Sequence, residues 1–276
     1  MKIKLIIYSN LRVFLLNCCP PILLKLARQF RDKNSISFTG NYVSWASAEV
    51  HTSGYNADEI FQRVRESALK VQRGKAVFER DSVCFYQEEY RWPALACLLS
   101  VAAERGCKLN VLDFGGALGS FYFQHKKFFN RLKSVRWSVV EQAHFVECGK
   151  NEFQNEELRF YSNIDECLVN GKVDVVFLSS VLQYLENPES MLITLSKTKV
   201  DYILIDRTPF IKDSNNRITV QNVPESIYKA TYPAWFFSSN KFDELISKIG
   251  YRLIEEFDGD DDVGIGKFKG YFLERV

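Results

Sequence analysis

The sequence carries almost no net charge, since 36 Lys and Arg residues nearly balance 34 Asp and Glu residues and leave +2 at neutral pH. A domain that binds nucleic acid normally shows a clear basic excess, because it has to neutralise phosphates. DNA and RNA are therefore not expected as partners.

Three motifs that would indicate a known chemistry are missing. The chain has no C-x-x-C pair, no G-x-S-x-G and no G-x-x-x-x-G-K. These absences argue against a zinc site, a hydrolase nucleophile elbow and a P-loop. His51, His125 and His144 are isolated in the sequence, so we predict no metal site and a structural or surface role for each. The seven cysteines lie mostly among apolar residues, which predicts a reducing, cytoplasmic compartment.

Acidic residues are absent from the first 30 positions, which are apolar and basic, and we treat residues 1–34 as a separate leader. A cleaved signal peptide is disfavoured, because Arg12 interrupts the apolar run and Pro20-Pro21 follows without a small-residue cleavage site. The uncharged run from Val13 to Leu24 is also much shorter than the ~20 residues of a membrane span. Two interpretations remain. The leader either rests as an amphipathic segment on the inner face of an anionic membrane, or packs as a helix on the domain.

Residues 35–106 predict a helical N-terminal cap. Residues 35–54 are rich in Ser, Gly, Thr and aromatic residues and predict an ordered loop. Apolar residues then recur at helical spacing from Ala57 to Val71, and Gly74 ends this helix. Pro93 suits the first turn of a second helix that runs to Ala103.

From residue 107 the pattern changes to alternating strands and helices. Continuous apolar runs, such as the one that follows Asp174, are typical of parallel strands covered on both faces. The last two strands lack a helix between them and must pair as an antiparallel hairpin. We expect strands at Leu109–Phe114, Trp137–Glu141, Leu158–Tyr161, Val173–Ser179, Tyr202–Asp206, Tyr251–Phe257 and Phe268–Leu273. Residues 107–276 therefore predict an α/β, Rossmann-like domain of the class I methyltransferase type, with a seven-stranded, mostly parallel sheet.

A glycine-rich turn follows the first of these strands. The dinucleotide fingerprint G-x-G-x-x-G fails here, because Ala117 and Ser120 stand at its second and third glycine positions. The methyltransferase form, acid-x-G-x-G-x-G, is met except at Ala117, where alanine replaces the middle glycine. Such a turn lets the backbone approach a ligand, with a helix N-terminus behind it. We predict cofactor contacts from Asp113, Gly115, Gly116, Ala117 and Gly119; the alternative is a plain strand-to-helix turn.

Polar residues also follow the next three strands. Glu141, with Gln142 after it, stands 22 residues beyond Gly119, where an acid can accept hydrogen bonds from both ribose hydroxyls. Asn163 follows the third strand, where an adenine edge can be read. Ser179, Ser180 and Gln183 follow the fourth, beside the point where the strand order reverses. The alternatives are a solvated carboxylate at Glu141 and helix-capping roles for the serines and Gln183.

The fifth strand ends in Asp206 and Arg207. Charges directly after a buried strand are costly unless they are paired, so these two either serve the acceptor or pair with each other. We predict Asp206 as catalytic base, with Glu88 and Glu89 of the cap as weaker alternatives, and Arg207 as a substrate ligand. An aromatic insert at residues 209–237 adds two predicted substrate ligands, Tyr232 and Trp235. It equally suits a hydrophobic flap on the cap.

Four segments together carry a resemblance: Leu112-Asp-Phe-Gly-Gly-Ala-Leu-Gly119, Val139-Val-Glu-Gln142, Ser179-Ser-Val-Leu-Gln-Tyr-Leu185 and Asp206-Arg-Thr-Pro-Phe210. The chain resembles a bacterial family assigned as S-adenosylmethionine-dependent methyltransferases, often encoded among surface-polysaccharide biosynthesis genes. The resemblance runs from about Phe38 to the C-terminus and includes Glu79-Arg-Asp-Ser82 and Tyr232-Pro233. It implies the fold, S-adenosylmethionine as cofactor and a small-molecule or glycan acceptor, such as a sugar or a glycan precursor.

Two other functions remain in view. A non-catalytic relative would use the same fold as a binding module in a glycan assembly complex, and it predicts a blocked or empty cofactor cleft. An NAD-dependent sugar-modifying enzyme is disfavoured by the glycine spacing and by the terminal hairpin.

Overall fold

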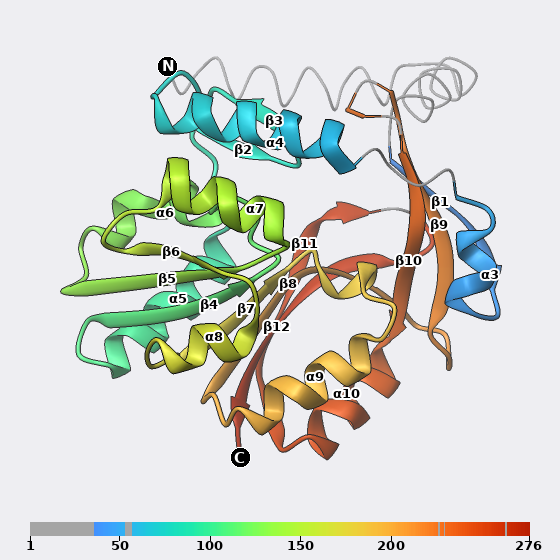
Figure 1. Cartoon of the computed structure of the whole chain (residues 1–276). Coiled ribbons are helices and arrows are strands. Elements are labelled where there is room, and N and C mark those ends of the chain that lie inside the picture. Colours follow the sequence, from blue (N-terminus) through green and yellow to red (C-terminus); the bar gives the residue numbers. More distant parts are fainter. Residues whose placement is uncertain (1–35, 53–56, 226, 229, 263) are drawn as a thin grey trace, which may run out of the picture.

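The computed structural model describes residues 36–52, 57–225, 227–228, 230–262 and 264–276 (Figure 1). The predicted leader, residues 1–34, lies outside the described residues, so both interpretations of it stay predictions. The boundary placed between residues 106 and 107 stays a prediction as well.

The predicted seven-stranded arrangement is confirmed. Five parallel strands form its centre, in the order β6-β5-β4-β7-β8. The strand β12 runs antiparallel to β8 and pairs on its other side with β11, which closes the hairpin at this edge. These strands are β4 (Lys108–Phe114), β5 (Ser134–Val140), β6 (Leu158–Tyr161), β7 (Val175–Ser179), β8 (Tyr202–Ile211), β11 (Tyr251–Asp262) and β12 (Lys267–Arg275).

Both faces of this sheet are buried, which is why its strands appear as continuous apolar runs. Alternate residues enter two separate cores: Val175 and Phe177 of β7 face one, and Val176 and Leu178 face the other. Helices cover the two faces, with α6 and α7 on one side and α8, α9 and α10 on the other (Figure 1). Their bounds are α6 (Ser120–Phe129), α7 (Ala143–Cys148), α8 (Ile164–Val169), α9 (Pro188–Lys197) and α10 (Ser239–Lys248), and α7 continues into a π-helical turn, η1 (Gly149–Phe153).

The insert at residues 209–237 extends the sheet and is not a loop or flap. The strand β8 continues to Ile211, and β10 (Ala230–Ser238) pairs with this end of it. The strand β9 (Arg217–Val223) pairs antiparallel with β10. On the outer side of β9 lies β1 (Ser37–Tyr42), followed by α3 (Trp45–Glu49), within the segment predicted as an ordered loop. The described sheet therefore has ten strands instead of seven.

The two helices predicted for the N-terminal cap are present, but the cap also contains strands. The helix α4 (Ala57–Gln72) and the hairpin of β2 (Phe78–Arg80) and β3 (Val83–Phe85) pack over α6, as Figure 1 shows. The helix α5 (Trp92–Glu104) packs on β4 and β8 and so belongs to the central core.

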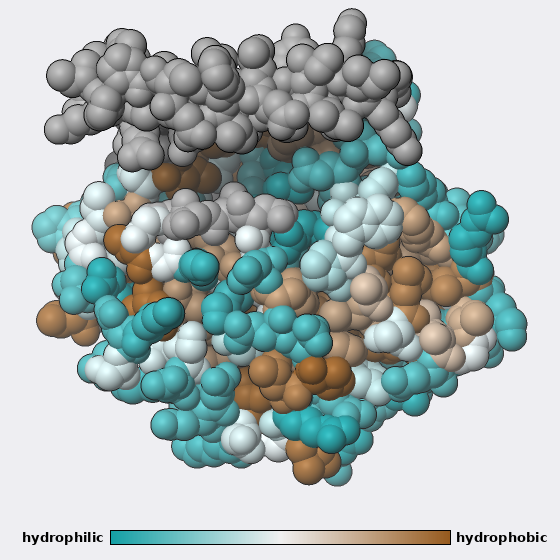
Figure 2. All heavy atoms as spheres, turned by 180° about the vertical axis from the view of Figure 1, so that it is seen from behind, coloured by the Kyte–Doolittle hydropathy of each residue, from teal (hydrophilic) through white to brown (hydrophobic). Residues whose placement is uncertain are grey.

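The surface of the described residues mixes hydrophilic and hydrophobic side chains, as the rear view in Figure 2 shows. Within the described ranges, no helix combines the length and the apolar character that crossing a bilayer requires.

Candidate functional site

A cavity of about 1270 Å³ opens at the carboxyl ends of the parallel strands, under the β2–β3 hairpin. Four neighbouring strands each contribute residues at or just after their ends: Gly115, Glu141, Asn163 and Ser180. Arg207 enters from β8. Ligand sites of open α/β sheets lie at this edge, where the strand order reverses. The volume exceeds the roughly 300–1,000 Å³ of ordinary small-molecule pockets, so it leaves room for two ligands side by side.

The glycine turn after β4 is built so that only glycine fits at two of its positions. Gly115 lines the cavity with φ at +75°, and a Cβ there would lie 2.7 Å from the Val181 side chain. A Cβ on Gly116 would lie 2.3 Å from the Asp113 carboxylate. The backbone is thereby held close to the cavity without a side chain in the way, which is the requirement for a cofactor cradle. Gly116 and Gly119 support this turn from outside the lining residues.

Ala117, the departure from the glycine pattern, adopts the left-handed conformation with φ at +50°. Its backbone N–H donates a hydrogen bond to the Glu141 carboxylate, so it connects the glycine turn to the end of β5. Ala117 does not line the cavity, and its methyl group therefore takes no space from a ligand.

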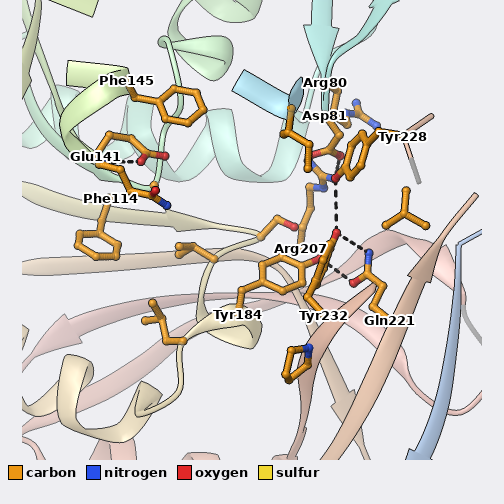
Figure 3. A pocket seen from close by; sticks show the side chains of 18 of the residues that line it. Arg80, Asp81, Phe114, Glu141, Phe145, Tyr184, Arg207, Gln221, Tyr228 and Tyr232 are labelled. Carbon is orange, nitrogen blue, oxygen red and sulfur yellow. Dashed lines mark hydrogen bonds and ion pairs between the residues drawn. The ribbon is translucent and has the colours of Figure 1, made fainter. Parts of the chain in front are cut away.

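Glu141 presents a carboxylate to the cavity (Figure 3). Its Oε2 accepts a 2.7 Å hydrogen bond from the backbone N–H of Gln142, which also lines the cavity. Burial raises the pKa of this carboxyl group. A carboxylate has about four acceptor positions, so two remain for the hydroxyls of a ribose after the backbone bonds are made.

Asp113 does not reach the cavity. Its Oδ2 accepts a 2.8 Å hydrogen bond from Nε1 of Trp137 in the core, and burial raises its pKa to about 7. Asp113 thus supports the glycine turn from below and is not positioned to touch a cofactor, which corrects the predicted contact.

The residues after β6 and β7 divide between lining and supporting positions. Asn163 lines the cavity, and its side chain also caps α8 by accepting a 2.8 Å bond from the Glu166 N–H. Ser180 lines the cavity, while Ser179 does not. Gln183 is buried: its Nε2 donates to Ser180 Oγ at 3.0 Å and to the backbone oxygen of Arg207 at 3.3 Å. Gln183 therefore joins the end of β7 to the middle of β8 and does not line the cavity.

Asp206, predicted as the catalytic base, is fully buried and does not line the cavity. Its Oδ1 lies 2.6 Å from Nη2 of Arg91, and its Oδ2 lies 3.2 Å from Nε of the same guanidinium. A carboxylate held in a buried, two-contact ion pair cannot reach a substrate in the cavity, so the structure contradicts this role. Glu88 and Glu89 pair instead with Lys127 and Arg80, and neither lines the cavity.

Arg207, predicted as a substrate ligand, lines the cavity, but its partner was not foreseen. Its Nη2 donates a 2.9 Å hydrogen bond to Oδ2 of Asp81 at the tip of the β2–β3 hairpin. The alternative of an Asp206–Arg207 pair is not what the structure shows, because each residue pairs with a residue more than 100 positions earlier in the chain.

A hydrogen-bonded row of side chains forms the wall around Arg207 (Figure 3). Tyr184 donates to Gln221 Oε1 at 2.9 Å, Gln221 Nε2 donates to the Tyr232 hydroxyl at 3.1 Å, and the Tyr228 hydroxyl lies 3.4 Å from that of Tyr232. We call these four residues the tyrosine wall. All four line the cavity, but only Tyr232 was predicted as a ligand.

Trp235, the other predicted ligand of the insert, is not among the residues that line the cavity and packs behind two that are. It stacks on Trp45 of α3 and donates from Nε1 to the backbone oxygen of Leu185 at 3.0 Å. Tyr228 belongs to the aromatic insert, and Tyr184 belongs to the motif after β7, so aromatic residues near strand ends were the available signal for both. Nothing in the sequence marked Gln221. Among the described residues, no three His, Cys, Asp or Glu side chains form a group that could hold a metal ion.

Comparison with known proteins gave matches only among solved structures. No protein-family model matches the chain, and no curated protein matches it. Similar structures include the N-terminal domain of EvdMO1 with SAH bound, at 13% identity over 81% of this chain and 98% of that one, with a TM-score of 0.49. Magnesium protoporphyrin IX methyltransferase from Synechocystis PCC 6803 with bound SAM is 14% identical over 82% and 100% of the two chains, with a TM-score of 0.46.

A third structure is an amino pentose methyltransferase from Micromonospora echinaspora, at 12% identity over 77% and 97% of the two chains, with a TM-score of 0.44.

Proposed function

We propose that this protein is an S-adenosylmethionine-dependent methyltransferase. The observation that carries the proposal is the pairing of Gly115 and Glu141, which follow adjacent parallel strands and face one cavity. A turn without side chains lets a cofactor approach the protein backbone closely, and a carboxylate beside it can accept hydrogen bonds from a ribose. The resemblance of the sequence to a methyltransferase family points to the same cofactor.

The residues around Gly115 and Glu141 suit different parts of the expected cofactor. Glu141 would accept the ribose hydroxyls, and the turn at Gly115 would hold the methionine part. Asn163, Ile164 and the rings of Phe114 and Phe145 line the same region and suit an adenine, which needs apolar faces and a polar edge. The cofactor supplies a methyl group already activated on a sulfonium, so the protein mainly has to position an acceptor and exclude water.

For the acceptor we propose a sugar hydroxyl or a glycan precursor in surface-polysaccharide biosynthesis, at a cytoplasmic site where the leader contacts the membrane. The acceptor rests on the family resemblance, and the membrane contact rests on the apolar and basic composition of residues 1–34. The alternative is a non-catalytic binding module with a blocked or empty cofactor cleft, and the open cavity of about 1270 Å³ argues only against a blocked one.

Titration of the full-length protein with S-adenosylmethionine and with S-adenosylhomocysteine tests the proposal. We expect saturable heat in calorimetry and an upward shift of the melting temperature with either compound, because a ligand that binds the folded state stabilises it. NADH serves as the matched negative ligand. Absence of heat and of thermal protection with both sulfur compounds would refute the proposed function.

A further inference from the structure

We propose that the tyrosine wall is the acceptor subsite, that it takes a neutral, hydroxyl-bearing ring, and that Asp81 receives the proton of the hydroxyl being methylated. This inference rests on the proposed function, since it assigns the second half of the same cavity. The earlier candidate for the base, Asp206, is excluded by its buried pairing with Arg91.

The cavity has two chemically different ends (Figure 3). Phe114, Glu141 and Phe145 lie together at one end, which the glycine turn adjoins. Asp81, Arg207 and the tyrosine wall lie at the other end. The first end has the features of a nucleoside site, so the second end is left for the molecule that the cofactor would meet.

The second end is assembled from segments that only the fold brings together. Asp81 comes from the tip of the β2–β3 hairpin, and Tyr184 comes from η2 (Leu182–Tyr184) after β7. Gln221 and Tyr232 come from β9 and β10, the strands that extend the sheet. This extension therefore builds one wall of a cavity whose other wall belongs to the central sheet.

The hydrogen-bonding groups of the wall match hydroxyls. Three phenol hydroxyls and one amide offer both donors and acceptors, which is the pattern that alcohols need. The rings of Tyr184 and Tyr232 meet edge to face with their centroids 5.2 Å apart, so they form a fixed aromatic surface against which a ring can pack.

The charges at this end favour a neutral acceptor. The cationic side chains that line the described cavity belong to Arg80 and Arg207, and both are paired, with Glu89 and Asp81. A phosphate or carboxylate placed against the wall would have to displace one of these partners and would meet the negative charge of Asp81. A hydroxyl group avoids both costs.

Asp81 is positioned to act as a base, and the tyrosines are not. Its carboxylate lines the same end of the cavity as Tyr184 and Tyr232, where Oδ2 accepts a 2.9 Å hydrogen bond from Nη2 of Arg207 (Figure 3). Burial raises the pKa of Tyr184 to about 12 and also raises that of Tyr232, so both phenols stay protonated near neutral pH. They can orient an acceptor hydroxyl, while the proton has to go to a carboxylate.

The backbone at Arg207 gives a second indication that this end is functional. Arg207 lies inside β8, yet its φ is +50°, in the left-handed region. Asp81 also has a positive φ, of 52°, but there it fits the two-residue turn of a hairpin. Non-glycine residues held in this region within a strand cluster at active sites and ligand clamps. The strained residue is thus the one that holds Asp81.

In the proposed transfer, a methyl group moves from sulfur to the acceptor oxygen. The acceptor oxygen uses a lone pair to form a bond to the methyl carbon, and the carbon–sulfur bond of the sulfonium breaks with its electron pair left on sulfur. The acceptor O–H bond breaks, its electron pair stays on oxygen, and its proton goes to the Asp81 carboxylate. The products are a methyl ether, S-adenosylhomocysteine and a protonated Asp81, which releases its proton to water.

A panel of methyl glycopyranosides of hexoses, 6-deoxyhexoses and N-acetylhexosamines provides the probes for the test. Binding to the full-length protein saturated with S-adenosylhomocysteine is measured by calorimetry, and transfer is measured from tritiated S-adenosylmethionine. We expect at least one glycoside to bind and to be methylated by the wild type. Asp81→Asn should keep its S-adenosylmethionine affinity and lose about 100-fold or more in kcat, which is the range of a general base.

Two further variants keep the result interpretable. Asp213→Asn, which removes a carboxylate paired with Arg217 outside the cavity, should leave kcat unchanged. Tyr232→Phe should weaken glycoside binding about 10-fold without changing cofactor affinity, which is the scale of one hydrogen bond. If the cofactor binds but no glycoside binds or is methylated, the acceptor assignment is wrong. If Asp81→Asn retains the wild-type kcat, the role of Asp81 is wrong, and if no cofactor binds, the proposed function itself fails.

Discussion

Arg91 and Asp206 form a buried ion pair, with 2.6 Å between Nη2 and Oδ1, that connects the start of α5 to the middle of β8. The next residue along the strand, Arg207, lines the cavity. The backbone N–H of Arg91 also donates to Nε2 of His125 at 3.1 Å, and burial lowers the pKa of that histidine to about 4, so it is neutral. These contacts support the strand that carries Arg207. Arg91, Asp206 and His125 do not themselves line the cavity.

Asp206→Asn should therefore act on stability before it acts on chemistry. It removes the negative charge from a buried ion pair, and breaking such a pair costs about 3–5 kcal/mol of the free energy of unfolding. Urea unfolding measures the change, and Asp213→Asn, at an exposed pair, should cost less than about 1 kcal/mol. An Asp206→Asn protein of wild-type stability that is inactive would instead restore Asp206 as the base.

Glu141→Ala should weaken S-adenosylmethionine binding by about 10- to 100-fold. Hydrogen bonds to a charged group contribute about 1.5–3 kcal/mol, and 1.4 kcal/mol corresponds to a factor of ten. Calorimetric titration gives the dissociation constants, with Glu147→Ala as the control, because Glu147 is exposed on α7 outside the cavity. Equal affinities for the two variants would show that Glu141 does not hold the ribose.

Ala117→Gly should be at least as stable as the wild type, and Ala117→Val should be less stable. The left-handed conformation at φ +50° costs alanine about 1–2 kcal/mol, which glycine avoids, although glycine loses about 0.5–1 kcal/mol through the entropy of the unfolded chain. A β-branched residue fits this region worst. Cofactor affinity should stay the same in Ala117→Gly, because the N–H that bonds Glu141 is kept; a loss of affinity measured by calorimetry would contradict this account.

Glu79→Gln should flatten the dependence of stability on pH. Glu79 is buried on β2 and accepts a hydrogen bond from the Ser120 hydroxyl, and burial raises its pKa to about 7, with Asp81 adding to the rise and Arg207 opposing it. The folded state therefore keeps the proton over a range in which the unfolded chain, with its ordinary carboxyl pKa near 4.5, has lost it.

The stabilisation from that proton is complete below about pH 4.5 and is lost as pH rises through about 7, by up to about 1.4 kcal/mol per pH unit. Urea unfolding between pH 5 and 8 measures the slope in the wild type and in Glu79→Gln. Parallel slopes would mean that Glu79 is ionised in the folded protein. Asp113, whose pKa burial raises to about 7, contributes a slope of the same sign in both proteins.

The central sheet could be predicted because its signals are local. Each parallel strand is covered on both faces and therefore appears as a continuous apolar run, and the helix between two strands has its own spacing. The glycine turn and Glu141 were predictable for the same reason, since each stands directly at the end of such a strand.

The sheet extension could not be predicted in this way. The strand β1 pairs with β9, and Thr39 bonds to a residue 181 positions away, so neither segment shows its partner in its own pattern. The position of a charged side chain at the end of a strand could not be predicted either. Such a side chain can point into the core or into the cavity.

The amino-acid sequence by itself therefore determined three local features of this protein. It showed which segments are buried strands, where the backbone turns on glycine, and where a carboxylate follows a strand. Only the tertiary structure decided that Asp206 pairs with Arg91, and that Asp81 and Arg207, 126 positions apart, meet at the cavity beside the tyrosine wall. The physical reason is that burial and turn formation depend on neighbouring residues. The partner of a charge depends instead on which distant segments the packed core brings within a few ångströms.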